Sequence, residues 1–265
     1  MALVQVNFIS KSLSRTVTFN AVIPTDSLPI PGEPAPEKKP FKTLYLLHGI
    51  FGNYTDWISG TSIQSLAQRK NLAVIMPSGD NSFYVDHEAS GDMYGEFIGR
   101  ELVDQTRELF HLSCRREDTF IGGLSMGGYG ALRNGLKYHD TFGCIIALSS
   151  ALILRDAMVS THDAPVNFAK RGYYESVFGD LTKLMGSDKD PEALIAILKR
   201  QNADIPKIYL ACGSEDFLIR QNRDYRDFLQ AQGVEFTYEE GPGIHDWIFW
   251  DKYIEKAINW LPLDY

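Results

Sequence analysis

A serine between glycines carries the clearest chemistry in this sequence. Residues 123–127 read Gly-Leu-Ser-Met-Gly, directly after the strand-like run 118–122 and before a helix-like segment with further glycines. Glycines on both sides of Ser125 permit the sharp strand-to-helix turn that presents a serine hydroxyl as a nucleophile. A glycine-rich turn around a serine can also be a tight loop and nothing more, so the motif gains its meaning from partners elsewhere in the chain.

Two later residues have the chemistry that a serine nucleophile requires. The hydroxyl reacts at neutral pH when a neutral imidazole takes its proton and an anion orients that imidazole. Asp216 follows the strand-like run 207–211, and His245 follows the run 235–239. The order Ser, Asp, His, each residue after a strand, is that of the α/β-hydrolase triad. Glu215 is a rival carboxylate, and each residue alone could be an ordinary cap or surface residue.

Acyl transfer also needs N–H donors for the oxyanion of the tetrahedral intermediate. In a fold of this kind one donor is the backbone N–H after the nucleophile, here Met126. The other comes from the loop after an early strand, where residues 48–52 read His-Gly-Ile-Phe-Gly. We expect Ile50 to supply it, with Phe51 as the alternative and His48 as a support of the loop.

Strand-like and helix-like segments alternate through most of the chain. Strands are predicted at 4–9, 16–23, 43–47, 72–76, 118–122, 142–148, 207–211 and 235–239. Helices are predicted at 63–69, 96–110, 126–138, 191–199, 220–232 and 247–260. The first two strands read as an antiparallel pair at one sheet edge. The later alternation predicts an α/β fold, with a mostly parallel central sheet and helices on both faces.

Two segments interrupt the alternation. The proline-rich stretch 24–40 predicts a surface loop, because proline is excluded from central strands. The stretch from about 150 to 206 mixes glycines, aromatic and polar residues with one clear helix, which is typical of a small cap insertion. With 265 residues, we expect a single domain over 1–265 that buries roughly three quarters of its unfolded surface.

Charge and composition exclude several classes of protein. The net charge of −8 argues against a nucleic-acid or anionic-membrane partner, and no apolar run approaches the ~20 residues that span a bilayer. The first ten residues lack the basic and apolar regions of a signal peptide, so a cytoplasmic location is expected. The three cysteines, too few and scattered for disulfides or a zinc site, are expected to be buried free thiols: Cys114, Cys144 and Cys212.

Four segments together resemble the esterase D group of α/β-hydrolases, most closely its bacterial tributyrin-esterase branch. They read LLHGIFGNYTDW, GGLSMGGYGAL, GSEDFL and GIHDWIFW, and the match runs from about Thr43 to the C-terminus. The resemblance implies a serine carboxylesterase that hydrolyses short-chain acyl esters through an acyl-enzyme intermediate, without a cofactor or metal. It places the triad at Ser125, Asp216 and His245. The wider relatives include S-formylglutathione hydrolases and carbohydrate esterase family 1.

The substrate is less well specified than the chemistry. A small-molecule ester is the expected partner, and the oligomeric state, including a homo-oligomer, stays open. Alternative activities are a sugar-ester esterase of the acetyl-xylan or feruloyl type and an S-formylglutathione-type thioesterase; a binding module on the same scaffold is a further class. Aromatic residues are core residues more often than ligand contacts, but four of them are candidates to bind substrate: Phe51, Trp57, Tyr84 and Trp247.

Overall fold

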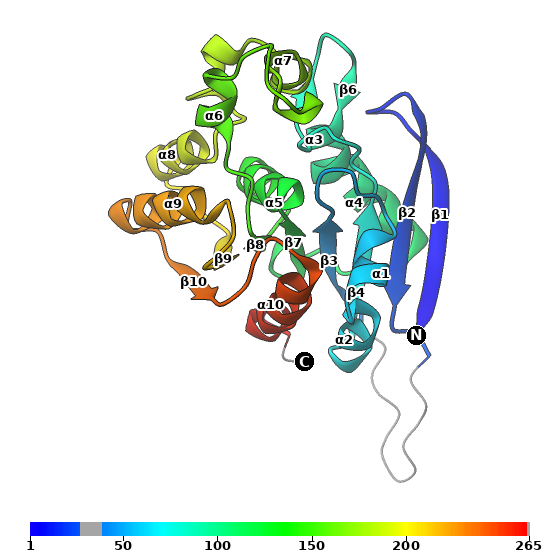
Figure 1. The fold of residues 1–265 in the computed structure, drawn as a ribbon. Coiled ribbons are helices and arrows are strands. Elements are labelled where there is room, and N and C mark those ends of the chain that lie inside the picture. The colour runs from blue at the N-terminus through cyan, green and yellow to red at the C-terminus, as the bar shows by residue number, and fades with distance from the viewer. Residues whose placement is uncertain (27–38, 264–265) are drawn as a thin grey trace.

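Eight strands form one mixed sheet, in the order β1-β2-β4-β3-β7-β8-β9-β10 (Figure 1). The computed structural model describes residues 1–26 and 39–263. From β4 to β10 all neighbouring strands are parallel, whereas β1 with β2 and β2 with β4 are antiparallel. The strands of this sheet are β1 (Ala2–Ser10), β2 (Arg15–Ile23), β3 (Lys42–Leu47), β4 (Leu72–Pro77), β7 (Thr119–Leu124), β8 (Cys144–Leu148), β9 (Lys207–Gly213) and β10 (Phe236–Gly241). A separate short pair consists of β5 (Asp86–His87) and β6 (Asp92–Met93).

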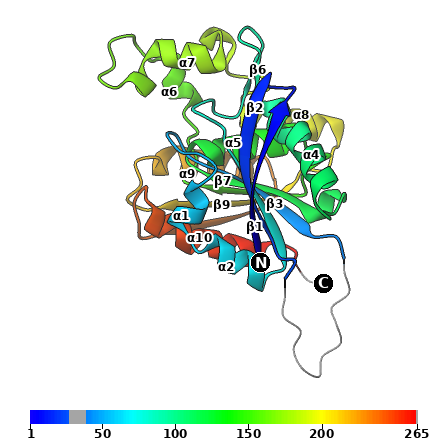
Figure 2. The same cartoon turned by 90° about the vertical axis from the view of Figure 1, so that its right-hand side faces the viewer.

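Helices cover both faces of the sheet (Figure 2). Side chains alternate along a strand, so Leu44 and Leu46 enter the core under α2 (Ile63–Arg69) and α10 (Trp247–Trp260). Tyr45 enters the opposite core, under α4 (Leu102–Leu109), α5 (Met126–Lys137) and α9 (Ile219–Ala231). The other helices are α1 (Asp56–Gly60), α3 (Tyr94–Glu96), α6 (Leu154–Met158), α7 (Arg171–Phe178) and α8 (Pro191–Gln201). The short 3₁₀ and π turns are η1 (Phe97–Glu101), η2 (Arg116–Asp118), η3 (Asn167–Ala169) and η4 (Leu181–Lys183).

The predicted strands and helices lie within two residues of the observed ones at their ends. One predicted helix differs from the observed structure in its interior. The segment predicted as a helix over 96–110 begins with α3 and contains the π turn η1 before α4. Gly99 lies in that turn, and a Cβ atom there would be 2.1 Å from the ring of Tyr138. The hydrophobic period predicts a helical turn but does not distinguish a π turn from an α turn.

The segment between β8 and β9 holds more helix than the sequence predicted. Besides α8 it contains α6, of five residues, and α7, of eight, which lie at the top of the molecule in both views (Figures 1 and 2). Helices this short show too few turns for a clear hydrophobic period, so the sequence pattern missed them. The Tyr173 hydroxyl of α7 donates to the backbone oxygen of Asn81 at 2.8 Å, which ties this segment to the loop after β4.

Two smaller expectations concern the loop and the thiols. Most of the proline-rich loop expected over 24–40 lies outside the described residues. Cys144 and Cys212 are buried free thiols as predicted, but the expectation is wrong for Cys114, which is exposed. Cys114 follows α4 in a connecting segment rather than in a central strand, which accounts for its exposure.

Candidate active site

The chain turns sharply at Ser125, between β7 and α5. Ser125 has φ 53° and ψ −118°, a conformation that costs free energy in a residue with a side chain. Hydrogen bonds to the end of β8 hold it: the Ser125 N–H donates to the Leu148 oxygen, and the Ala151 N–H donates to the Ser125 oxygen, both at 2.9 Å. The strained turn is therefore fixed by the neighbouring strand.

The glycines of the motif allow α5 to begin directly against the sheet. A Cβ atom on Gly127 would lie 2.5 Å from the Leu47 backbone oxygen, and one on Gly123 would lie 2.4 Å from the Gly127 oxygen. These atoms belong to the backbone and cannot move aside as a flexible side chain would. The two glycines are thus required by close approach of the helix to the strand ends.

His245 lies between Ser125 and Asp216 and forms hydrogen bonds with both. Its Nε2 is 3.0 Å from the Ser125 Oγ, and its Nδ1 is 2.9 Å from Asp216 Oδ2 and 3.1 Å from Oδ1. Because a carboxylate only accepts hydrogen bonds, Nδ1 carries the proton in the neutral ring. Nε2 is then the basic nitrogen, directed at the serine hydroxyl.

Asp216 is buried, yet its environment favours the charged form. Burial raises the pKa of the carboxyl, but hydrogen bonds from His245, the Leu218 N–H and Ser149 outweigh this and place the pKa below its ordinary value. The side chain of Asp216 is 0% exposed. The rival, Glu215, accepts from the Gly243 N–H and the Ser214 hydroxyl instead. The structure thus brings Asp216, and not Glu215, to the imidazole.

The loop after β3 lies against Ser125 and is held from behind by His48. A Cβ atom on Gly49 would be 3.5 Å from the Ser125 Cβ. The His48 Nδ1 is 2.6 Å from the Gly49 oxygen, and its Nε2 accepts the Gly79 N–H at 2.8 Å. The peptide group between Gly49 and Ile50 is planar and trans, so fixing its oxygen toward His48 directs the Ile50 N–H the opposite way. Burial lowers the pKa of His48 and keeps the ring neutral.

The two candidates for the second oxyanion donor differ in how their N–H groups are used. The Phe51 N–H donates to Asn81 Oδ1 at 2.8 Å, and Phe51 has φ 69°. Within residues 1–26 and 39–263, the N–H groups of Ile50 and Met126 meet no acceptor. Met126 is the first residue of α5, where an N–H has no partner inside the helix. The geometry favours Ile50 over Phe51.

The four aromatic candidates for substrate binding lie in different surroundings. Trp57 and Tyr84 are 1% and 0% exposed. The Trp57 indole N–H donates to the Leu47 oxygen, and the Tyr84 hydroxyl to the His48 oxygen, both at 3.0 Å. Tertiary packing covers both rings, and they support the end of β3; that they also contact substrate stays a prediction.

The other two aromatic candidates are more accessible. Trp247 is half-buried and packs edge-to-face on Trp57 and Trp250, with ring centroids 5.6 and 5.2 Å apart. Phe51 is 68% exposed and meets Phe168 of η3 edge-on at 5.2 Å. Phe51 thus has the free surface that a substrate-binding residue needs.

Sequence reasoning missed a contact around the Asp216 and His245 pair. The Trp250 indole N–H donates to the Ser149 Oγ at 3.2 Å, and the Trp250 ring lies edge-on to His245, with centroids 4.9 Å apart. Ser149 in turn helps to lower the pKa of Asp216. Both residues stand next to recognisable segments, the end of β8 and the start of α10, but only packing brings them together.

Neither a metal site nor a membrane-spanning helix is found among the described residues. In the described part of the chain, no group of three or more His, Cys, Asp or Glu side chains is placed to hold a metal ion. The helices of that same part are all too short or too polar to cross a membrane.

The fold and the turn at Ser125 define the chain as a protein of the α/β-hydrolase fold. The chain belongs to the Esterase family, whose profile, described as "Putative esterase", matches residues 10–261. It is 50% identical over 261 residues to an acetyl esterase of Caldicellulosiruptor saccharolyticus, covering 98% of each chain. These findings identify a carboxylic ester hydrolase and confirm the predicted group of esterases.

Two solved structures from Staphylococcus aureus agree with this family. The chain is 33% identical to the fluorophosphonate-binding serine hydrolase F, with a TM-score of 0.87, covering 100% of this chain and 99% of that one. It is 33% identical to an S-formylglutathione hydrolase, with a TM-score of 0.84 and 99% of each chain covered. Together with the family, these relatives make this chain a serine carboxylic ester hydrolase.

Proposed function

We propose that this chain hydrolyses short-chain acyl esters with Ser125 as nucleophile, His245 as general base and acid, and Asp216 as the group that orients His245. The observation that carries the proposal is the continuous hydrogen-bonded path from Asp216 through His245 to the Ser125 Oγ, with distances of 2.9 and 3.0 Å. The depressed pKa of Asp216 keeps the carboxylate charged at neutral pH, which the imidazolium requires during turnover.

The reaction follows from the positions of these atoms. His245 Nε2 accepts the proton of Ser125 as its Oγ attacks the ester carbonyl carbon, and the N–H groups of Ile50 and Met126 stabilise the oxyanion. The tetrahedral intermediate collapses, the alkoxy group leaves with the proton from His245, and an acyl-serine remains. Water then attacks the acyl carbon, with His245 again accepting a proton and returning it to Ser125.

Two observations bear on the acyl group, one on its length and one on its polarity. The relative that is 50% identical over nearly the whole chain is an acetyl esterase. Two exposed apolar side chains lie close to His245: Phe217 is 74% exposed, with its ring centroid 4.6 Å from that of His245, and Ile244 is 54% exposed. Apolar surfaces of this kind suit the hydrocarbon part of an ester better than a charged group.

The S-formylglutathione-type thioesterase is the second candidate, because one similar structure carries that name. Glutathione thioesters bring two carboxylates to the site, whereas Phe217 and Ile244, both exposed beside His245, are apolar. A sugar-ester esterase of the acetyl-xylan or feruloyl type is a third possibility within the same chemistry. The bulk and polarity of the leaving group separate the three.

The test is a substrate series on purified protein. We expect kcat/KM for 4-nitrophenyl esters to be highest at acetate or butyrate and to fall toward octanoate. Tributyrin, acetylated xylan, methyl ferulate and S-formylglutathione are assayed beside them. Efficient turnover of the glutathione thioester alone would replace the carboxylesterase proposal by the thioesterase one.

Two further expectations accompany this proposal. We infer that residues 150–206 act as a cap over the site within one domain, supported by α6 and α7 lying at the top of the molecule (Figures 1 and 2) and by Phe168 meeting Phe51. A cytoplasmic location stays a prediction. Limited proteolysis tests the first expectation: cleavage into two stable fragments, each folded alone, would contradict a single domain.

A further inference from the structure

The loop after β4, residues 79–85, has a strained backbone. Three of its residues have left-handed backbone angles, with φ 45° at Asp80, 53° at Phe83 and 56° at Tyr84. None of the three is glycine, so each conformation costs free energy and persists only where the surrounding structure holds it. The proposed reaction uses no side chain of this loop. The loop does contact the turn that carries the proposed oxyanion donor, Ile50.

The peptide group before Ile50 depends on this loop through His48. The Gly79 N–H donates to the His48 Nε2 at 2.8 Å, so the proton of the neutral ring is on Nδ1. That Nδ1 donates to the Gly49 oxygen at 2.6 Å, which fixes the peptide group whose N–H belongs to Ile50. The Tyr84 hydroxyl donates to the His48 oxygen at 3.0 Å. The loop thus sets the direction of the N–H that would meet the oxyanion.

The peptide group after Ile50 depends on the loop through Asn81. The Phe51 N–H donates to the Asn81 Oδ1 at 2.8 Å. A hydrogen bond of 3.2 Å from the last N–H to the first backbone oxygen closes the turn 49–52. With φ 69° at Phe51 the turn is of type II, whose third position usually holds glycine. Rotation of the peptide group between Ile50 and Phe51 would relieve this strain but would turn the N–H away from Asn81, so the Asn81 bond holds the turn in its strained form.

Asn81 also contacts the cap segment, residues 150–206. The Tyr173 hydroxyl of α7 donates to the Asn81 backbone oxygen at 2.8 Å. Phe168 of η3 meets the Phe51 ring edge-on, with centroids 5.2 Å apart. Asn81 thus bonds the turn through its side chain and the cap segment through its backbone.

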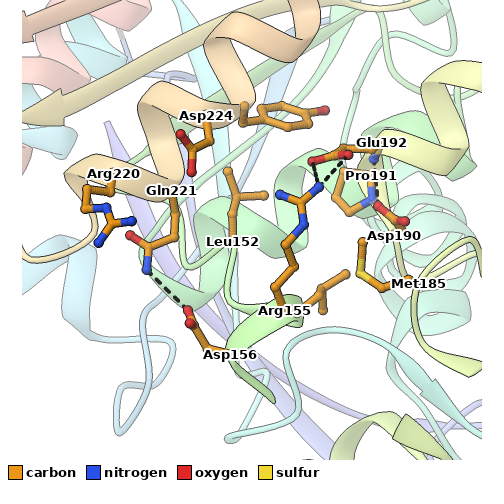
Figure 3. Close-up of a pocket in the computed structure, with 12 residues that line it drawn as sticks. Leu152, Arg155, Asp156, Met185, Asp190, Pro191, Glu192, Arg220, Gln221 and Asp224 are labelled. Atoms are coloured by element: carbon orange, nitrogen blue, oxygen red, sulfur yellow. Dashed lines mark hydrogen bonds and ion pairs between the residues drawn. The ribbon is translucent and has the colours of Figure 1, made fainter. Parts of the chain in front are cut away.

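The cap segment is also fixed to α9 (Figure 3). Arg155 of α6 pairs with Glu192 of α8 at 3.0 Å. The Gln221 Nε2 of α9 donates to the Asp156 Oδ2 of α6 at 3.2 Å. Helix α9 begins shortly after Asp216. The cap segment therefore connects the helix that follows the proposed catalytic carboxylate with the loop that holds the proposed oxyanion donor.

We propose that Asn81 is a positioning residue for the oxyanion hole and that its bond to Tyr173 makes the hole depend on the docked cap segment. The inference rests on the proposed function, because it needs the Ile50 N–H to stabilise the oxyanion. Asn81 acts through the backbone of residues 50 and 51 and moves no proton in the reaction. With the cap segment docked, Asn81 holds the turn and the hole is formed; with the segment displaced, the turn is free to relax.

Asn81→Leu tests the first part, because leucine has a similar size and accepts no hydrogen bond. Loss of an oxyanion donor costs about 10²- to 10³-fold in rate, so its displacement should lower kcat for 4-nitrophenyl acetate about 10- to 100-fold, with KM nearly unchanged. The inhibition constant of a trifluoromethyl ketone, whose adduct with serine carries an oxyanion, should rise by a similar factor. Asn53→Leu is the matched control, because Asn53 accepts the Thr55 N–H at 2.8 Å in the same connecting segment. Its kcat should stay near the wild-type value.

Tyr173→Phe tests the second part, the dependence on the cap segment. This change removes the hydroxyl and leaves the ring, and we expect kcat to fall about threefold to tenfold in the wild-type background. In the Asn81→Leu background it should cause no further loss, because the two changes act through one hydrogen-bonded path. Tyr129→Phe is the matched control, since the Tyr129 hydroxyl donates to the Lys189 oxygen at another point of the cap segment. Its kcat should stay near that of the wild type.

The outcomes separate the inference from the proposed function. Wild-type protein without ester hydrolysis, or hydrolysis that persists in Ser125→Ala, would overturn the proposed function. An active wild type whose kcat is unchanged or higher in Asn81→Leu would overturn the inference alone, as would a rise in KM only or additive losses in the double variant. If circular dichroism shows that Asn81→Leu does not fold, equal kcat values in Tyr173→Phe and Tyr129→Phe would overturn it.

Discussion

Helix α5 has a cluster of ionisable side chains near each end, and the two clusters differ in how fully their polar groups are paired. At the N-terminal end, Ser125 meets His245 and, through it, Asp216. In the C-terminal half, Arg133 and Lys137 bind two carboxylates from other segments. Both clusters join parts of the chain that are far apart in sequence.

In the C-terminal cluster, all three guanidinium nitrogens of Arg133 have hydrogen-bond acceptors. Arg133 is 0% exposed, and its guanidinium donates to Asp188 Oδ2 at 2.6 Å, to Asp86 Oδ2 at 3.3 Å and to Asn134 Oδ1 at 2.8 Å. Its Nε also donates to the Asp188 backbone oxygen at 3.1 Å. These bonds connect α5 to β5 and to the segment before α8, so the cluster fastens the upper segment to the body of the fold.

The cluster at Ser125 ends at a hydroxyl group whose hydrogen bonding is incomplete. His245 is anchored through Nδ1, while Nε2 faces a hydroxyl that carries no further partner among the described residues. A buried charge network with every group paired stabilises structure, whereas one that ends at an accessible hydroxyl is free to move a proton. The comparison predicts that substitutions in the two clusters separate activity from stability.

The largest expected effect is that of Ser125→Ala. We expect kcat for 4-nitrophenyl acetate to fall about 10⁴- to 10⁶-fold, because the nucleophile is lost while substrate binding remains. The unfolding midpoint should change little. Hydrolysis at the wild-type rate by this variant would show that Ser125 is not the nucleophile.

Asp216→Asn is expected to lower kcat by about 10⁴-fold, since the neutral amide no longer fixes the productive tautomer of His245. Glu215→Gln is the matched control, because Glu215 is exposed and its side chain, among the residues that the structure describes, bonds Ser214 and Gly243. Its kcat should stay near that of the wild type. Equal losses in both variants would remove the distinction between the two carboxylates.

Arg133→Met is expected to act on stability and not on chemistry. Removing the buried guanidinium leaves Asp86 and Asp188 without their main partner, and breaking a buried pair in this way costs about 3–5 kcal/mol. Urea unfolding measures the loss, while kcat of the folded variant should stay close to the wild-type value. Lys137→Met, at a position 30% exposed, serves as the milder control; an equal loss there would argue against a special role of Arg133.

The smallest expected effect is a dependence of stability on pH. Burial raises the pKa values of Asp86 and Asp188, but Arg133 and Lys137 outweigh it, so both lie below their ordinary values. Groups with a depressed folded pKa stabilise the protein above the unfolded pKa of about 3.9 and lose that contribution as the pH falls through the folded value. Urea midpoints between about pH 5 and pH 2.5 should fall more steeply in the wild type than in Arg133→Met. Parallel curves would mean that the cluster does not couple to protons.

Much of the architecture could be read from the sequence because it rests on local patterns. The apolar runs that become β3, β7 and β9 are short and uninterrupted, and the period of α10 is clear, so their bounds were predicted closely. The short helices α6 and α7 and the π turn inside the 94–109 segment lack such a pattern. Their form depends on what they pack against.

The candidate site divides in the same way. Ser125, Asp216 and His245 stand in motifs after strands, which the sequence alone places at one edge of a parallel sheet. Trp57 and Tyr84 stand in equally recognisable segments, yet both are buried supports. No local pattern tells an aromatic ring that faces substrate from one that faces the core, since both are apolar and both lie near the motif.

By itself the sequence determined the alternating fold, the residue types of the site and their order along the chain, because glycines, strands and turns act over a few residues. Only the tertiary structure decided which neighbouring carboxylate meets His245, which N–H beside Ser125 is free, and where Arg133 finds its partners. Those outcomes depend on contacts between segments some 28 to 120 residues apart. Such contacts are fixed by packing and by the satisfaction of buried polar groups across the whole domain.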